Sequence, residues 1–364
     1  MLQRMNELAT QAANGTNSAD DRSAIQDEVD QLTTEIDRVA ETTKFNEIYL
    51  LKGDDSSTKN VYMKGHDAGL KGSLTDGAKT ATFMMDTLKE GDQYTIAGKE
   101  YTIGSAKGDL EALIDKADKE LTAAAAGTKD VEIDGKKYTL TYKAGGNTIA
   151  DADGNAVADL ATLKGKIAAG SKVTYGNTTL TAMNDVNGDG VDDDDDSIIT
   201  TAIAKSKIKA ELVTANNIGT TDHAATVADG VDDAAGKTSY TITKGYATVA
   251  NTLSFNLHVG ADADMTNKIN VSIDTMNSSN LGIKNLNVTD GTGTAATYAI
   301  DAISDAISKV SSQRSALGAV QNRLEHTIDN LDNISENTSS AESRIRDTDT
   351  VSYTHLRAHE TRRH

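Results

Sequence analysis

The stretch ISDAISKVSSQRSALGAVQNRLEHTIDNL, residues 303–331, decides the fold of this chain. It carries an apolar residue at every seventh position, namely Ile303, Val310, Leu317, Leu324 and Leu331. A strict repeat of seven predicts a long helix with one apolar seam, which is stable only when a partner helix covers it. Each Leu or Ile that becomes fully buried in such a seam would contribute about 1.5–3 kcal/mol.

A shorter heptad segment near the start of the chain offers the partner. Its seam residues are spaced by four and three positions: Ile25, Val29, Leu32, Ile36 and Val39. Ser18, three residues before Asp21, is typical of a helix start. We therefore expect residues 1–50 and 251–350 to form the two halves of one long antiparallel coiled-coil core. Two interpretations stay open: a plain bundle within one chain, or a rod whose outer faces pack against sister subunits.

Residues 51–250 differ in composition, being rich in Gly, Thr, Ala and Asp with short strand-like runs. Residues 94–103 and 131–140 each read as a strand, a Gly-containing turn and a second strand, and 173–180 is a weaker third copy. We interpret 51–250 as an inserted, β-rich outer domain of one or two small α+β modules whose ends lie close together. The predicted fold class is accordingly α+β.

The composition excludes several classes of function. Lys and Arg total 36 against 55 Asp and Glu, and the net charge of −19 argues against nucleic-acid and anionic-membrane partners. The absence of Cys excludes disulfides, thiolate metal sites and a Cys nucleophile. No apolar run approaches the ~18 residues of a membrane span, and the start does not resemble a signal peptide.

Signals of enzymatic chemistry are poor. The run HETRRH at 359–364 comes near the zinc-protease helix motif, but its second His follows the first by five residues instead of four and leaves the shared helix face. No Gly-rich phosphate loop and no nucleophile-elbow Ser is present. We therefore predict no catalytic residues and a protein that is not an enzyme.

One acidic run, DVNGDGVDDDDD at residues 185–196, fits a twelve-residue calcium loop. Its oxygen ligands would be Asp185, Asn187, Asp189, Asp193 and Asp196, with the carbonyl of Val191. Gly190 would supply the sharp turn, and the final Asp in place of Glu resembles the loops of dockerin modules. Asp192 fits poorly, because an apolar residue is usual at its position. The alternative is a solvated acidic loop, so Ca²⁺ is a candidate ligand while the fold requires no cofactor.

Motif-dense stretches accompany the two heptad blocks: LQRMNELA at 2–9, QAANGTNS at 11–18, TEIDRV at 34–39, TKFN at 43–46, LGAVQNRL at 317–324 and SRIRD at 343–347. With these stretches the two blocks resemble bacterial flagellin. The stretches occur in the order of that family, within 1–51 and 253–349. The resemblance implies a structural subunit of the bacterial flagellar filament, extracellular and exported through the flagellum's own channel without a signal peptide.

The resemblance also implies partners. Flagellin subunits pack core to core in the filament while a variable insertion faces outward, so sister subunits are expected partners. The family's core is also sensed by a host Toll-like receptor, and its receptor-contacting positions fall here on Arg4, Leu8, Ile25, Glu28 and Gln31. Ile25 equally fits the seam, and Arg4 and Glu28 equally fit a solvated or subunit-packing surface.

The chain departs from the family at both ends. Complete flagellins begin with a long helix upstream of the motif that starts here at Leu2, and end with a matching helix downstream of Asp349. We therefore expect both assembly helices to be missing and the chain to be a fragment, a soluble monomer that forms no filaments. Residues 351–364 break the helical pattern and hold three His and three Arg, so we expect a non-native tail.

Two alternatives to a filament subunit stay open. The first is a secreted, calcium-dependent binding or adhesion module carried by 51–250, which binding of a host glycan or mucin would favour. The second is an enzyme inserted into the outer domain, which hydrolytic activity dependent on a carboxylate of 185–196 would favour.

Overall fold

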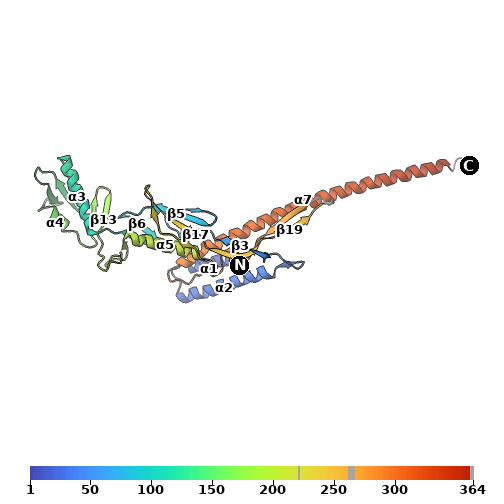
Figure 1. Cartoon of the computed structure of the whole chain (residues 1–364), viewed down its shortest axis with the longest axis horizontal. Helices are drawn as coiled ribbons and strands as arrows, with labels where there is room; N and C mark the ends of the chain where they lie inside the picture. Colours follow the sequence, from blue (N-terminus) through green and yellow to red (C-terminus); the bar gives the residue numbers. More distant parts are fainter. Residues whose placement is uncertain (220–221, 261–266, 361–364) are drawn as a thin grey trace.

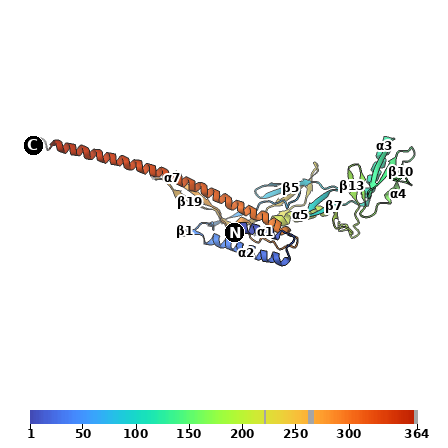
Figure 2. The ribbon, with the colours of Figure 1, turned by 180° about the vertical axis from the view of Figure 1, so that it is seen from behind.

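The computed structural model describes residues 1–219, 222–260 and 267–360. A helical base lies near the middle of the molecule, with a β-rich body beside it and an α+β module at one end, while one long helix projects from the opposite end (Figure 1). The view from behind shows the same arrangement, with the N-terminus at the base and the C-terminus at the tip of the projecting helix (Figure 2).

The helices of the base are α1 (Leu2–Ala12), α2 (Ala19–Thr42), α6 (Ser278–Leu281) and the first turns of α7 (Thr294–Glu360). Helix α2 begins with the predicted cap. The Ser18 hydroxyl accepts a hydrogen bond from the backbone N of Asp21, and the Asp21 carboxylate accepts one from the backbone N of Ser18. Helix α1 runs antiparallel to α7, because Ala13 at its end lies against Gly293, just before α7 begins.

One apolar cluster joins α1, α2, the segment 281–288 and α7. Its fully buried members are Met5, Ala9, Ala12, Val29, Ile283, Val288, Ala296, Ala299, Ile303 and Ala306. Both views show α1 between α2 and α7 (Figures 1 and 2). The predicted direct pairing of segment 20–40 with 303–331 is therefore wrong. Small Ala side chains on the buried faces of α1 and α7 let these two helices approach instead.

The predicted seam of α7 is packed only near its start. Ile303 is buried in the core cluster, and Val310 is partly buried against it. Leu317, Leu324 and Leu331 are also only partly buried, but they lie outside that cluster. Helix α7 has 67 residues and α2 has 24, which correspond to about 100 Å and about 36 Å at 1.5 Å per residue. The longer helix therefore extends past the base, and we name its residues 311–360 the arm (Figure 2).

Three strand pairs border the base: β1 (Lys44–Phe45) with β2 (Ile48–Tyr49), β3 (Asp54–Tyr62) with β18 (Tyr246–Asn251), and β19 (Leu253–His258) with β20 (Lys268–Ile273). All three pairs are antiparallel. The β3–β18 pair places the two ends of the segment 51–250 side by side. Strand β20 contacts α7 and so attaches the last pair to the long helix.

The β-rich body contains two sheets and helix α5 (Thr201–Asn217). One sheet has the order β15-β17-β5-β4, with β16 also paired to β17, and the other has the order β14-β7-β6. Their bounds are β4 Ser73–Asp76, β5 Thr80–Asp86, β6 Gln93–Ile96, β7 Lys99–Ile103, β14 Ile198–Ile199, β15 Thr226–Val227, β16 Val231–Asp232 and β17 Lys237–Thr243. Both sheets and α5 share one apolar cluster, which includes Phe83, Ile208, Tyr240 and, from α7, Tyr298.

The end module is a six-stranded sheet of order β11-β10-β9-β8-β12-β13 with two helices. The bounds are α3 Lys107–Ala124, β8 Thr128–Ile133, β9 Lys136–Thr141, β10 Thr148–Asp151, β11 Ala156–Val157, α4 Leu160–Lys164, β12 Lys172–Tyr175 and β13 Thr178–Thr181. The three predicted strand–turn–strand repeats are the hairpins β6–β7, β8–β9 and β12–β13. In the first two turns Ala97-Gly98 and Asp134-Gly135 all have positive φ, as a type I′ turn requires.

Helix α7 continues without interruption to Glu360. The predicted break of the helical pattern after Thr350 is therefore wrong, since residues 351–360 contain no Gly or Pro that would end a helix. Residues 361–364, which hold the second His of HETRRH, lie outside the described part of the chain. None of the described helices is both long enough and apolar enough to pass through a bilayer.

Candidate functional site: the helical base, the arm and the acidic loop

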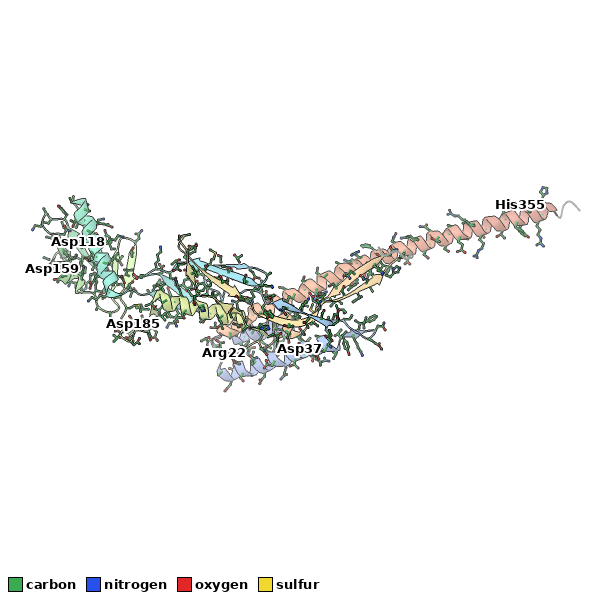
Figure 3. All side chains as sticks on the ribbon, in the orientation of Figure 1. Arg22, Asp37, Asp118, Asp159, Asp185 and His355 are labelled. Atoms are coloured by element: carbon green, nitrogen blue, oxygen red, sulfur yellow. The ribbon has the colours of Figure 1, made fainter. Side chains whose placement is uncertain are left out.

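A buried Arg on α2 ties three chain segments of the base together. The Arg22 guanidinium is 4% exposed and donates to the backbone oxygens of Ala12, Asn14 and Gly291 at 3.1, 3.3 and 3.4 Å. Ala12 ends α1, so the positive charge lies where the helix dipole places a partial negative charge. Figure 3 shows Arg22 and Asp37 on the same helix of the base.

Two further polar side chains of α2 hold the segment that precedes α7. Gln26 donates to the backbone oxygen of Leu286 at 2.7 Å and accepts from the backbone N of Val288 at 2.8 Å. Asp37 accepts from both the backbone N and the hydroxyl of Ser278, each at 2.7 Å. The sequence did not single out Arg22, Gln26 or Asp37. The signal that could have found the last two is their position, because each directly follows a seam residue of α2, Ile25 or Ile36, and so borders the apolar face.

An apolar groove of about 510 Å³ opens where α1, α2 and α7 meet. Its walls include Leu2, Ile36, Val39, Ala40, Met276, Ile307, Val310 and Leu317. Two predicted seam residues of α2, Val29 and Ile36, are buried in the core cluster, and Leu32 is partly buried against it. Val39 is partly buried and lines the groove instead. The groove continues the surface of α7 toward the arm, because Leu317 belongs to both.

Several apolar side chains of the arm are exposed, with no other described residue packed over them. Ile328, Ile334 and Ile345 are 56%, 47% and 68% exposed. Figure 3 shows His355 near the tip, with its side chain directed away from the helix. Together with the apolar groove, these exposed side chains form a surface suited to packing against other helices.

The positions compared with receptor contacts divide into two groups. The Arg4 guanidinium makes a bidentate pair with Glu28, with Nε–Oε1 at 2.8 Å and Nη2–Oε2 at 3.3 Å, and these hydrogen bonds raise the pKa of Arg4. Arg4 and Gln31 are exposed, and Glu28 is half-exposed. Leu8 and Ile25 are only 2% and 6% exposed, so their side chains pack in the base and are not available on its surface.

The acidic loop lies between β13 and α5, and Figure 3 shows Asp185 at its start. The Asp185 carboxylate accepts from the backbone N of Gly188, Asp189 and Gly190 at 2.7, 3.1 and 3.0 Å. Gly190 has the positive φ of +81° that the predicted sharp turn needs. The loop is thus closed by its own carboxylates on its own backbone amides.

Asp192, the residue that fitted the calcium pattern poorly, organises this loop. It is 2% exposed, and its carboxylate accepts from the backbone N of Asn184, Asp194 and Asp195 at 2.6, 2.9 and 2.9 Å. Among the described residues, no three His, Cys, Asp or Glu side chains are arranged to hold a metal ion. Calcium binding by 185–196 therefore stays a prediction from the spacing.

Known proteins match this chain at both ends and along its length. The family model for the bacterial flagellin N-terminal helical region matches residues 1–56, and that for the C-terminal helical region matches 300–356. Flagellin of Clostridium tyrobutyricum is 31% identical over 357 residues, which cover 97% of this chain and 70% of that protein. Flagellin of Salmonella choleraesuis is 28% identical, over 96% of this chain and 75% of its own length. The solved FliC structure from Burkholderia pseudomallei, 20% identical, covers 88% of this chain and 92% of its own with a TM-score of 0.28, too low to compare the folds.

The family models at both ends and the matching relatives place this chain, with its β-rich middle, among the structural proteins of the bacterial flagellum. The chain belongs to the flagellin family. It is a structural subunit of the flagellar filament, which is an extracellular assembly of flagellin subunits. The family places it among structural proteins and not among enzymes.

The matches correct one expectation about the ends. Both terminal helical regions of the family are matched, at 1–56 and 300–356, and α7 runs through the whole of the second. The prediction that both terminal helices are lacking is therefore wrong. The expectation of a chain that cannot form filaments rested on that absence and loses its basis.

Proposed function

We propose that this flagellin packs into the filament through its helical base and arm, with α1 and α7 as its antiparallel core. In this proposal residues 51–250 project outward as the variable outer domain. The observation that carries it is the uncovered apolar surface that runs from the groove at Leu317 along the arm. Within the end module, residues 107–181, the large apolar side chains, such as Leu110, Leu140 and Val173, are enclosed in the module's own core. This module therefore presents no comparable apolar surface for packing.

Charge substitutions on the arm test this proposal. Leu324→Asp with Leu331→Asp places two carboxylates on the apolar stripe, and we expect assembly of the full chain to fall at least tenfold. The matched control is Asn322→Asp with Asn333→Asp, which adds the same charge on the opposite side of the same helix, since successive residues are 100° apart. Filament yield is measured by sedimentation and electron microscopy. Equal loss of assembly in both variants, or in neither, would contradict the proposal.

The surface around Arg4 is the proposed contact for a host Toll-like receptor. Its support is that Arg4 is exposed and held by Glu28, while Gln31 lies one turn further along α2. The test compares Arg4→Ala with Arg38→Ala, another exposed Arg of the base, in cells that report receptor activation. We expect a loss of activity in Arg4→Ala of about tenfold and a small change in Arg38→Ala. The same response from both variants would remove the assignment.

Structural calcium binding by 185–196 is a second candidate role. It is supported by the ligand-type spacing and by the inward orientation of Asp185, Asn187 and Asp189, each of which accepts from a backbone amide of the loop. Calorimetric titration of the full chain with calcium chloride would compare wild type, Asp185→Ala and the exposed-loop control Asp153→Ala. Binding heat that Asp185→Ala alone abolishes is the expected result, and absence of heat in the wild type rejects the role.

A further inference from the structure

A His and an Asp from distant parts of the sequence meet at the junction between the β-rich body and α7. The His66 Nε2 lies 3.6 Å from the Asp305 Oδ2, and the two side chains are 16% and 21% exposed. That Asp305 oxygen is itself buried and has no hydrogen-bond partner among the described residues. The other oxygen, Oδ1, accepts from the Lys64 Nζ at 3.1 Å. The unpartnered carboxylate oxygen therefore faces the imidazole across a gap slightly too long for a hydrogen bond.

The backbone of His66 is fixed by the helix of the body. The Asn216 side chain on α5 accepts from the backbone N of His66 at 3.0 Å and donates to its backbone oxygen at 2.8 Å. Asn216 is itself 5% exposed. A cavity of about 190 Å³, lined by the segment around Met63 and by α7, leaves the imidazole room to approach Asp305. The ring can thus move while its backbone stays in place.

Charged groups of both signs surround the pair. Lys64, which pairs with Asp305, and Asp67 lie beside His66, and on α7 Asp301 interacts electrostatically with His66 and Asp305, and Lys309 with Asp305. One step further out, Asp76 of β4 acts on Lys64, and Lys244 (after β17) and Asp274 act on Lys309. Lys244 pairs with Asp76, and Glu211 accepts from the Tyr298 hydroxyl. Burial raises the pKa of Asp301 and lowers the pKa of Lys309, whose ammonium donates to the backbone oxygen of Asn280.

We propose that His66 and Asp305 form a pH-dependent latch that tightens the junction between the β-rich body and α7 in mild acid. Imidazoles gain a proton in the mildly acidic range. The imidazolium supplies the charge and the donor that Asp305 Oδ2 lacks, and the two close to hydrogen-bond distance. Stability that depends on a protonated His is present at low pH and is lost as the pH rises.

Hydrogen exchange of the full chain tests the latch. Protection factors, corrected for the intrinsic effect of pH, are compared at pH 5.5 and 7.5 for peptides covering 63–70, 212–218 and 300–309. We expect about fivefold more protection at pH 5.5, the upper value for a partly exposed ion pair. His66→Gln and Asp305→Asn should each remove the pH dependence. The control His258→Gln, at an exposed position of β19, should keep it.

The variants separate the latch from general destabilisation. If His66→Gln lowers protection equally at both pH values but retains the difference between them, the latch is rejected. Equal protection of the wild type at pH 5.5 and 7.5 also rejects it. Loss of the pH difference in both latch variants, with circular dichroism unchanged at pH 7.5 and the His258→Gln control unaffected, supports it.

Discussion

Replacing Arg22 with Met would loosen the helical base, because the buried guanidinium joins the C-terminal end of α1 to the segment before α7. A hydrogen bond from a charged donor contributes about 1.5–3 kcal/mol. Only the 3.1 Å bond to Ala12 approaches the usual length of a charge-assisted bond, and the 3.3 and 3.4 Å bonds to Asn14 and Gly291 are long. Counting the first bond fully and the others weakly gives a loss of about 3 kcal/mol, which includes the cost to the carbonyls that lose the Arg22 donor.

Because the chain has several separately packed clusters, global unfolding is not expected to be two-state, and a local measurement is needed. Hydrogen exchange of peptides from α1 and from residues 286–293 reports the opening of the base. A loss of about 3 kcal/mol corresponds to exchange about 100-fold faster in Arg22→Met. Arg38→Met, which removes an exposed Arg paired with Glu35 on its own helix, should change exchange less than threefold. If Arg22→Met behaves like Arg38→Met, the guanidinium does not hold the base together.

Three further predictions concern other parts of the chain. Gly190→Ala should weaken the packing of the acidic loop on the start of α5 by about 2–4 kcal/mol, because a Cβ would lie 2.7 Å from Ile203 and Thr200. Gly188→Ala, with a similar positive φ but open space, should cost about 1 kcal/mol. Hydrogen exchange of peptides from 185–205 measures both effects, and equal effects would contradict the packing argument. The hydrogen bonds from Ser18 lower the pKa of Asp21, so the cap of α2 should be intact above about pH 4 and be lost in stronger acid. Amide exchange of the first turn of α2 should accelerate as the cap is lost, and Asp21→Asn should lack this pH-dependent acceleration. Burial raises the pKa of Tyr94 to about 12 and also raises the pKa values of Tyr240 and Tyr298. In a titration followed by absorbance at 295 nm, part of the tyrosine signal should therefore appear only in strong alkali. A single transition near pH 10 would show that these three side chains are not buried.

Local rules in the sequence were enough to predict several elements. The start of α2 at Ser18 and the hairpins around Gly98 and Gly135 follow from residues that are neighbours in the chain, so no tertiary information is needed. The motif-dense segments at both ends were sufficient to indicate the family. A heptad pattern, however, states only that a helix has an apolar side, and it does not identify the helix that covers it. For this reason the pairing of 20–40 with 303–331 was wrong, and α1 occupies that position.

Polar residues that act through the fold could not be found from the sequence. From the sequence, Asp192 only fits the calcium-loop pattern poorly. In the fold its carboxylate is buried and accepts hydrogen bonds from three backbone amides. Arg22 resembles any solvated helix residue until α1 and Gly291 surround it. His66 and Asp305 are 239 positions apart, and no pattern along the chain relates them. The packing of α1, α5 and α7 creates these contacts.

Packing of the chain into the filament through the arm is tested by finding which surface becomes buried there. Hydrogen exchange of peptides from residues 311–345 of the arm and from the end module, 107–181, would be compared between the free chain and filaments built from it. If the arm is the packing surface, it gains strong new protection and exchange in the end module stays unchanged. New protection of the end module with an unprotected arm would contradict packing through the arm.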